Sequence, residues 1–329
     1  MQDKQSVLVT GGAGYIGSHI VQLLCEMGHR VTVLDNLSLG REENVDKRAS
    51  LLVGDILNRD DLRKALSVQP RVIFHFAAWK AAGESMTDPA KYATNNICGT
   101  LGLLNAMLEY DIRYFVFSSS AAVYGEPQYT PIDEKHPLHP ANYYGYTKLA
   151  IEENLQWYSR LKGIRYAALR YFNATGYDIH GRIRGKEKNP ANLSPVVMET
   201  IAGLRHEMQV FGDDYETPDG TCIRDYIHVS DLAVAHLKAM EYLLENDENL
   251  VVNLGTGEGH SVKEVIQTAE RVTGKKVNYT ITDRRPGDPP ALAASNHLAK
   301  ELLGWQPEYS DLDTIFRTMA SVYLDKDSK

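Results

Sequence analysis

The sequence predicts an α/β protein with a doubly wound parallel sheet and a smaller C-terminal region. Short, continuous apolar runs alternate with longer helix-like segments through the first half of the chain, as expected for parallel strands covered on both faces. A glycine-rich segment joins the first apolar run to the first of these helices. After Asn173 the pattern changes to longer polar stretches, which indicates a second region.

The predicted strands occupy residues 7–10, 31–34, 51–53, 72–76, 114–117, 167–171 and 251–254. Predicted helices lie at 16–27, 60–67, 88–110 and 144–162, and later near 196–206, 230–245, 262–273 and 313–323. Residues 177–192 and 283–290 are predicted as loops because they are rich in Gly, Pro, Asn and basic residues. The repeated strand–helix–strand order predicts right-handed crossovers between parallel strands.

Composition excludes several classes of protein. The chain has 329 residues, 24% of them charged, and a formal net charge of −8 without a basic run, which argues against nucleic-acid binding. No stretch approaches the roughly 18 apolar residues that span a bilayer, and the N-terminus does not resemble a signal peptide. Cys25, Cys98 and Cys222 are far apart and make no metal-ligand spacing with His. We expect a cytoplasmic protein with reduced thiols and no metal.

Gly11, Gly14 and Gly17 follow the first predicted strand and open the first predicted helix. Glycines let backbone N–H groups approach a pyrophosphate closely, and the helix N-terminus adds partial positive charge. A purely structural turn is the alternative. The strand–turn–helix context favours a dinucleotide site.

Asp35 ends the second predicted strand, about 20 residues after the last of these glycines. A carboxylate at this position accepts hydrogen bonds from an adenosine ribose and repels a 2′-phosphate, which favours NAD. Arg41 is the argument for NADP, and Asn36 and Ser38 also fit a simple turn. Asp55, after the third predicted strand, is expected either to hold the adenine amino group or to cap a helix.

Tyr144 and Lys148 are four residues apart, so a helix places both side chains on one face. Free Tyr titrates at about 10, and a neighbouring ammonium or a positive nicotinamide stabilises its phenolate. Ser120 follows the predicted strand at 114–117, at the edge where ligands bind in such sheets. Each pattern alone is common by chance. Together they predict an acid–base site that oxidises a hydroxyl.

The chain resembles the extended short-chain dehydrogenase/reductase family, and within it the UDP-hexose 4-epimerases. The segments that carry the resemblance are residues 10–17, 35–38, 76–85, 95–96, 118–125, 144–148, 169–173, 192–193 and 221–231. They span almost the whole chain in the expected order. The resemblance implies a Rossmann-like NAD-binding domain, which we place at residues 1–173 with a return of 225–256, and a nucleotide-sugar-binding region at 174–329. It also implies a homodimer formed through the predicted helices at 88–110 and 144–162. From the sequence alone, the alternative is that both helices simply cover the sheet.

The activity that the resemblance implies is isomerisation of UDP-galactose and UDP-glucose. Tyr144, with Ser120 and Lys148, removes the proton of the sugar 4-hydroxyl while hydride passes from C4 to NAD. The 4-keto sugar rotates, and hydride returns to its other face. The implied cofactor contacts are Gly11, Gly14, Tyr15, Ile16, Gly17, Asp35, Asn36, Ser38, Asp55, Ile56, Phe76, Ala77, Lys80, Asn95, Tyr144, Lys148 and Phe172. The implied contacts of the UDP-sugar are Lys80, Ser120, Tyr144, Asn173, Asn192, Leu193, Gln209, Val210, Phe211, Arg224, Arg285, Asp288 and Leu292.

Two departures from the family pattern stand out. Ala78 and Trp79 replace the Gly and Leu that are frequent there, which we expect to alter packing beside the cofactor more than chemistry. Leu292 lies where a Tyr excludes N-acetyl sugars and a small residue admits them. We expect a preference for UDP-glucose and UDP-galactose, with weak or moderate acceptance of UDP-N-acetyl sugars.

The alternatives are other NAD-dependent nucleotide-sugar enzymes: an epimerase of N-acetyl or uronic sugars, a dehydratase or decarboxylase, or a reductase. Dehydratases carry an Asp-Glu pair after the strand-end Ser or Thr, whereas Ala121 and Ala122 cannot transfer protons. A cofactor sensor on the same fold is a different class of function, because fold alone does not determine activity. The retained Tyr144, Lys148 and Ser120 argue against it.

Overall fold

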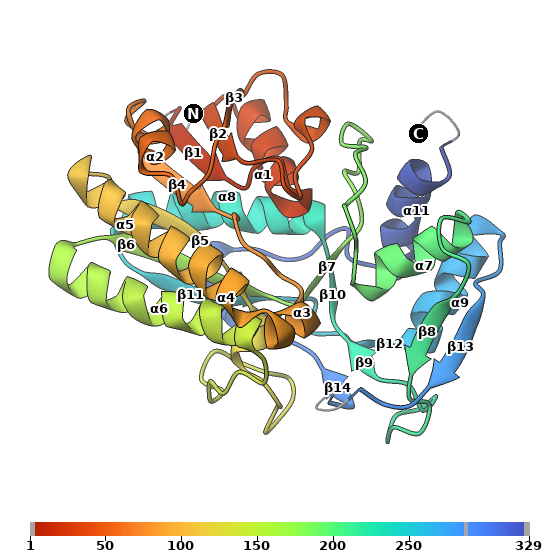
Figure 1. The fold of residues 1–329 in the computed structure, drawn as a ribbon. Helices are drawn as coiled ribbons and strands as arrows, with labels where there is room; N and C mark the ends of the chain where they lie inside the picture. Colours follow the sequence, from red (N-terminus) through yellow and green to blue (C-terminus); the bar gives the residue numbers. More distant parts are fainter. Residues whose placement is uncertain (1–3, 286–288, 326–329) are drawn as a thin grey trace. The chain divides into compact units, whose positions relative to one another are not determined.

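The computed structural model describes residues 4–285 and 289–325 (Figure 1). Packing divides the chain into two compact units. Unit 1 is drawn from residues 1–125, 138–170 and 233–252, and unit 2 from residues 126–137, 171–232 and 253–329. The segment that returns to unit 1 is therefore 233–252 rather than 225–256, and residues 126–137 belong to unit 2. Within the described ranges, no helix is both long and apolar enough to cross a membrane.

A seven-stranded sheet forms the centre of unit 1, in the order β11-β6-β5-β4-β1-β2-β3. Its strands are β1 (Ser6–Thr10), β2 (Arg30–Asp35), β3 (Ser50–Val53), β4 (Val72–His75), β5 (Tyr114–Ser120), β6 (Arg165–Tyr171) and β11 (Leu250–Leu254). All seven predicted strands are confirmed. From β1 the chain proceeds outward to β2 and β3, then returns to β4 on the other side of β1, with parallel pairing throughout this part. This reversal defines the switch point of a doubly wound, Rossmann-like sheet, beside which ligands bind.

Helices cover the sheet of unit 1. They are α1 (Tyr15–Glu26), α2 (Arg59–Leu66), α3 (Ala82–Thr87), α4 (Pro89–Tyr92), α5 (Gly99–Glu109), α6 (Tyr143–Lys162) and α8 (Val229–Asn246), with short 3-10 turns η1 (Glu42–Asn44) and η3 (Ala121–Val123). Leu8, Ile73 and Phe115 on one face of the sheet share a buried cluster with Leu103 of α5 and Ile151 of α6. The valines that alternate with them in β1 and β2 are also buried, and α1 packs against these two strands. Both faces are covered, which explains the continuous apolar runs in the sequence.

The predicted single helix at 88–110 is wrong in one respect. Between α4 and α5 the backbone forms a π-helical turn, η2 (Ala93–Cys98). Asp88 is the N-cap of α4, and its side chain accepts from Lys91 N at 3.2 Å. π-Helical turns occur frequently at functional sites. This one carries Asn95 and Asn96.

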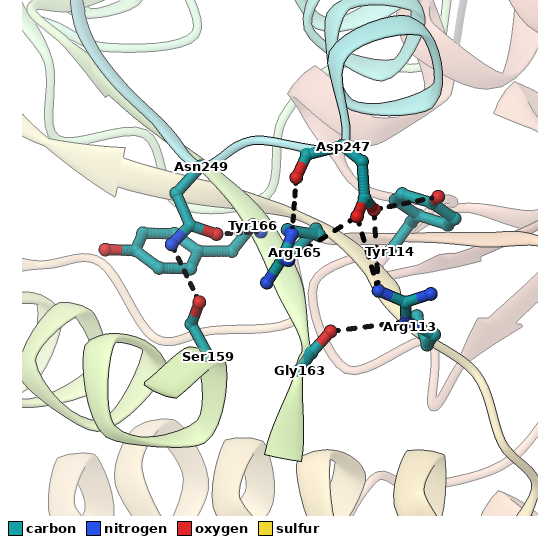
Figure 2. Close-up of polar contacts among 8 residues, drawn as sticks. All are labelled: Arg113, Tyr114, Ser159, Gly163, Arg165, Tyr166, Asp247 and Asn249. Carbon is teal, nitrogen blue, oxygen red and sulfur yellow. Dashed lines mark hydrogen bonds and ion pairs between the residues drawn. The ribbon is translucent and has the colours of Figure 1, made fainter. Parts of the chain in front are cut away.

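The loop between α8 and β11 ties together the amino ends of three neighbouring strands. Figure 2 shows Asp247 between the guanidinium groups of Arg113 and Arg165, which pair with it at 3.5 and 3.4 Å. The hydroxyl of Tyr114, the first residue of β5, donates to the same carboxylate at 3.1 Å. Asn249, just before β11, accepts from Tyr166 N at 3.1 Å. These contacts connect the amino ends of the strands. The carboxyl ends, where ligands bind in such sheets, remain available.

Unit 2 contains three small sheets and further helices (Figure 1). Its strands are β7 (Asn173–Thr175), β8 (Met208–Phe211), β9 (Ile223–Arg224), β10 (Tyr226–His228), β12 (His260–Ser261), β13 (Tyr279–Thr282) and β14 (Ala291–Leu292). Its helices are α7 (Leu193–Ile201), α9 (Val262–Thr273), α10 (His297–Leu303) and α11 (Leu312–Tyr323). Strand β9 lies between β12 and β14, β7 pairs with β10, and β8 pairs with β13. The predicted loop at 177–192 is confirmed.

Candidate active site

The glycine-rich loop makes a tight turn between β1 and α1. Gly11 has a φ of 73°, and a Cβ there would overlap the main chain of Phe76 and Ala77. Gly14 N donates to Gly11 O at 3.1 Å, and Gly14 caps α1 without any side-chain hydrogen bond. The first turn of α1 contains no acidic residue. Its amide groups and partial positive charge therefore suit an anionic group such as a pyrophosphate.

Asp35 organises this loop from the end of β2. Its carboxylate is 7% exposed and accepts from Ala13 N at 2.9 Å and from Leu37 N at 2.8 Å. A carboxylate at the end of this strand can also accept hydrogen bonds from ribose hydroxyls. Arg41, the residue that suggested NADP, pairs with Glu43 at 3.4 Å.

Asp55 belongs to the same polar group at the carboxyl ends of β2 and β3. It accepts from Asn36 Nδ2 at 2.9 Å and from Leu57 N at 2.8 Å. The cap of α2 is instead Asn58, whose side chain accepts from Asp60 N and Asp61 N. The helix-capping alternative for Asp55 is therefore wrong. Ser38 is joined to this group through its amide, which donates to Asn36 Oδ1 at 3.0 Å.

A buried histidine, His75, contacts the residue that precedes the glycine-rich loop. His75, the last residue of β4, contacts Thr10 Oγ1 through Nδ1 at 2.6 Å and Thr100 Oγ1 through Nε2 at 2.8 Å. The Thr100 hydroxyl donates to Asn96 O, so it accepts from Nε2, and Nδ1 accepts from Thr10. Burial, reinforced by the charge of Lys148, lowers the pKa of His75 to about 3. His75 is thus a neutral element of the framework.

The segment after β4 carries the next group of predicted contacts. Phe76 N donates to Thr10 O at 2.8 Å, which continues β4 beside β1 and places Ala77 against Gly11. Lys80 is exposed, with its ammonium 5.7 Å from the centre of the Tyr15 ring. Asn95 donates to the Oδ1 of Asn96 at 3.1 Å.

Asn96 fixes the conformation of this segment, a role that was not predicted. Its side chain is 1% exposed, accepts from Trp79 N at 2.9 Å and donates to Trp79 O at 2.9 Å. It also contacts Thr147 Oγ1 of α6 at 3.2 Å. The π-helical turn that aims Asn96 inward has no reliable signal in the sequence.

Tyr144, Ser120 and Lys148 come together as predicted. Tyr144 lies in the first turn of α6, partly buried, and its hydroxyl is hydrogen-bonded to the hydroxyl of Ser120 at the end of β5. The ammonium of Lys148 is 5.8 Å from the centre of the Tyr144 ring and donates to Ser118 O at 2.7 Å. The side chain of Lys148 is buried, with its ammonium 4.9 Å from the centre of the Phe117 ring.

The electrostatics of this group differ from the expectation drawn from the sequence. Burial raises the pKa of Tyr144 above its ordinary value, and only the hydrogen bond to Ser120 opposes this. Burial also lowers the pKa of Lys148 to about 7, against the opposing charge of Glu152. The protein alone therefore does not make Tyr144 a strong base. A positive charge beside its ring is needed to stabilise the phenolate.

Two further residues hold Tyr144 in place and were not predicted. Ser85, fully buried in α3, accepts from Tyr144 N at 3.0 Å and donates to Ala82 O at 2.6 Å. A Cβ on Gly145 would overlap the carbonyl oxygen of Ala122, so only glycine allows α6 to pack this closely on η3. The segment at 76–85 carried the family resemblance, but nothing in it singled out Ser85.

In unit 2, Asp225 connects three of the residues predicted to bind a UDP-sugar. The carboxylate of Asp225 is buried and accepts from Thr256 N, Gly257 N and Ala294 N. Asn173 donates from Nδ2 to Asp225 O at 2.9 Å, and Asp225 N donates to Leu292 O at 3.0 Å. Arg224 and Leu292 are direct partners across the parallel pair β9–β14.

Strand β8 presents a free main-chain edge within the described residues. Met208 N donates to Asn278 O, just before β13, and Gly212 N donates to Thr282 O at the end of β13. The main-chain groups of Gln209 and Phe211 therefore point the other way. Amide and carbonyl groups in this arrangement match the imide edge of a pyrimidine. The guanidinium of Arg285 lies 3.8 Å from the centre of the Phe211 ring.

The remaining predicted contacts divide by exposure. Asn192 is exposed and caps α7, whose first turn begins at Leu193 and contains no acidic residue. The side chains of Ile56, Phe172 and Val210 are buried. Tyr15 and Ile16 are partly buried at the start of α1. Asp288 lies outside the described residues.

Comparison with known proteins matches this arrangement. Residues 7–255 match the model of the NAD dependent epimerase/dehydratase family. The chain is 47% identical over 313 residues, 94% of its length, to the UDP-glucose 4-epimerase of Halalkalibacterium halodurans, covering 93% of that protein.

Solved structures show the same similarity. A UDP-glucose 4-epimerase from Brucella ovis in complex with NAD superposes with a TM-score of 0.93 at 49% identity, covering 95% of this chain and 97% of the other. A UDP-glucose 4-epimerase from Bifidobacterium longum in complex with NAD+ and UDP gives a TM-score of 0.90 at 36% identity, covering 98% of this chain and 99% of that one.

Proposed function

The chain belongs to the NAD-dependent epimerase/dehydratase family, and we propose that it is a UDP-hexose 4-epimerase that interconverts UDP-galactose and UDP-glucose. The observation that carries this proposal is the group formed by Tyr144, Ser120 and Lys148 beside the glycine-rich loop. The relatives over nearly the full length of the chain carry the same enzyme name.

The glycine-rich loop fits NAD. Gly11 and Gly14 leave the amino end of α1 open to a pyrophosphate, and Asp35 offers acceptor positions for unmodified ribose hydroxyls. When bound, NAD would supply a reversible hydride acceptor for C4 of the sugar. Because no net oxidation results, the cofactor is expected to stay with the protein through many turnovers.

Tyr144 takes the proton of the sugar 4-hydroxyl, and Ser120 orients that oxygen by hydrogen bonding. Burial holds the pKa of Tyr144 high, so its phenolate needs a positive charge nearby. When protonated, Lys148 supplies such a charge, with its ammonium near the face of the Tyr144 ring. After the 4-keto sugar has turned over in the site, Tyr144 returns the proton to O4. The same three side chains therefore serve both half-reactions.

For the UDP group we propose Arg224 and Arg285 as diphosphate ligands, because guanidinium forks match phosphate oxygens. The free edge of β8 at Gln209 and Phe211 is proposed to hold the uracil, and Asn173, Asn192 and Leu193 to complete the site. Of the alternative activities, dehydration is disfavoured because η3 supplies only the methyl groups of Ala121 and Ala122 after Ser120.

A direct test is to incubate the purified protein with UDP-galactose, without added cofactor, and to identify the sugar nucleotides formed. We expect UDP-glucose to accumulate to equilibrium, and Tyr144→Phe to reduce the rate by about 10³-fold or more because the acid–base group is lost. Tyr110→Phe is the matched control, since Tyr110 precedes β5 at the opposite edge of the sheet. Absence of any interconversion, even with NAD supplied, would refute the proposed reaction.

We also infer a cytoplasmic homodimer. Support for the dimer comes from α6, where Tyr146, Trp157 and Leu161 are exposed by 50%, 55% and 66%. Large apolar side chains that gather on one helix are typical of an interaction surface.

Support for a reducing compartment comes from Cys25, Cys98 and Cys222, which form no disulfide within the part of the chain that the structure describes. Sedimentation of the wild type and of Trp157→Glu/Leu161→Glu tests the dimer: only the variant is expected to be monomeric.

A further inference from the structure

Three consecutive serines at the end of β5 contact three successive turns of α6. The hydroxyl of Ser120 binds that of Tyr144, the carbonyl oxygen of Ser118 accepts from Lys148, and the hydroxyl of Ser119 donates to Glu152 Oε1 at 2.5 Å. Tyr144, Lys148 and Glu152 are spaced by four residues, so they lie along one face of the helix. Glu152 extends the line of the two catalytic side chains by one turn.

Glu152 belongs to a buried ion pair. Its carboxylate accepts from Arg170 Nε at 3.0 Å and pairs with Arg170 Nη2 at 2.5 Å. The third guanidinium nitrogen of Arg170, Nη1, donates to the hydroxyl of Tyr124 at 3.0 Å. Glu152 is 1% exposed and Arg170 is 4% exposed. Water therefore screens these charges weakly, and each acts on its neighbours at short range.

Lys148 is the neighbour on which these charges act. The ionisable groups around it are Tyr144 and Glu152 on its own helix and His75 on β4, and Arg170 on β6 lies behind Glu152. The side of Lys148 toward β5 provides the Ser118 carbonyl and the Phe117 ring, which carry no charge. Since His75 is neutral, Glu152 is the anion that stabilises the ammonium, and Arg170 partly cancels it.

We propose that Glu152 and Arg170 are a pair of positioning residues that sets how tightly Lys148 holds its proton, and so the pH range in which Tyr144 works. This role rests on the proposed epimerase chemistry. A structural ion pair would explain the burial. It would not explain why Glu152 lies one helical turn from Lys148. Nor would it explain why Glu152 is held by Ser119, which stands between the serine that contacts Lys148 and the serine that contacts Tyr144.

The pair can be tested by removing each charge separately. Glu152→Gln removes the anion and leaves Arg170 unbalanced, so the ammonium of Lys148 loses stability. Arg170→Gln leaves Glu152 unbalanced and stabilises the ammonium. We expect the titration midpoint of Lys148 to move down in the first variant and up in the second, each by about 1 pH unit. The alkaline limb of kcat should move in the same two directions.

The titration is measured on the full-length protein from the ¹³C signal of the lysine Cε, assigned to Lys148 with a Lys148→Arg variant. Glu152→Asp keeps the charge and is expected to titrate near the wild type, as is Glu152→Gln/Arg170→Gln, in which no charge is unpaired. Asp178→Asn, which breaks the Asp178–Arg182 ion pair in unit 2, is the matched control and should not move the midpoint.

Opposite shifts in the two single variants would support the proposal. The proposal would be overturned if the Lys148 midpoint moved in the same direction in both variants. It would also be overturned if the midpoint did not move in variants that keep the native near-UV circular dichroism. Each single variant has its own expected direction of shift, so if one misfolds, a shift of the other in the wrong direction, or no shift, still overturns the proposal. Because the titration needs no substrate, it also separates this proposal from the proposed activity: a wild type that fails to epimerise UDP-galactose refutes only the latter.

Discussion

The amide N–H of Tyr144 donates a hydrogen bond to Oγ of Ser85 at 3.0 Å. Ser85 is fully buried and gives its own proton to Ala82 O, so its oxygen is available only as an acceptor. The amide belongs to the first turn of α6, where it has no partner within the helix. The bond therefore attaches the catalytic turn of α6 to the segment that lies against the glycine-rich loop.

We expect Ser85→Ala to lower kcat by about tenfold with little change in KM, because Tyr144 would lose its fixed position rather than its contact with bound substrate. The free energy of unfolding should fall by about 1 kcal/mol for the lost buried bond. Thr87→Ala is the matched control, since Thr87 Oγ1 bonds Glu84 O on the exposed side of the same helix. Equal kcat in Ser85→Ala and the wild type would contradict the positioning role.

Lys148 should reduce the stability of the protein in a pH-dependent way. Its pKa is about 7 in the folded protein and 10.5 in the unfolded chain, so the unfolded state binds the extra proton between these values. Stability therefore rises with pH through this window. Lys148→Met removes the penalty and should stabilise the protein by a few kcal/mol, on the order of 1.4 per unit of difference, at and below pH 7. The gain should vanish as pH approaches 10.5.

Urea unfolding of both proteins at several pH values, without cofactor, checks this prediction. The difference in unfolding free energy between Lys148→Met and the wild type is the measured quantity, which cancels the other titrating groups. A difference that does not change from pH 7 to pH 10 would show that Lys148 keeps its proton in the folded state. Activity should be lost in Lys148→Met at every pH.

The strands and most helices could be predicted because each is a local pattern. Residues 72–74 of β4 are continuously apolar since both faces of the sheet are covered. The four-residue spacing of Tyr144 and Lys148 likewise places both on one helical face whatever their surroundings. Predictions of this kind depend only on backbone periodicity, which the sequence displays directly.

What the sequence did not reveal depends on contacts between distant segments. Asn96 closes on Trp79 only because a π-helical turn redirects its side chain, and Ser85 acts only because α3 lies against α6. The expectation of a lowered Tyr144 pKa was wrong for the protein alone, since it counted nearby charge and ignored burial. Depth of burial is a tertiary property that a four-residue motif does not encode.

Adjacent arginines in the loop after β13 allow a matched test of diphosphate binding. Arg285 lies over the Phe211 ring, whereas Arg284 lies over Tyr215 and pairs with Asp214 at 2.6 Å. We expect Arg285→Lys to weaken UDP binding by about tenfold, because an ammonium cannot form the paired bonds of a guanidinium or stack in the same way. Arg284→Lys should stay within about twofold of the wild type. Calorimetric titration with UDP measures both, and equal losses would point to general charge rather than to Arg285.

Leu292 offers a test of sugar specificity. It is the direct partner of Arg224 across β9–β14 and is partly buried, so the side chain at this position can limit the space beside a sugar bound near Arg224. Leu292→Tyr adds bulk and should lower kcat/KM for UDP-N-acetylglucosamine relative to UDP-glucose by about tenfold or more. Leu292→Ala should raise the same ratio, because the N-acetyl group is larger than the hydroxyl that it replaces. Ala291→Ser is the control, since neighbouring side chains of a strand point to opposite faces.

The ratio of the two kcat/KM values is obtained by letting both substrates compete in one reaction. Ratios that stay the same in both Leu292 variants would remove this residue from the sugar site, and a wild type that turns over both substrates equally would overturn the expected preference for the unmodified hexose.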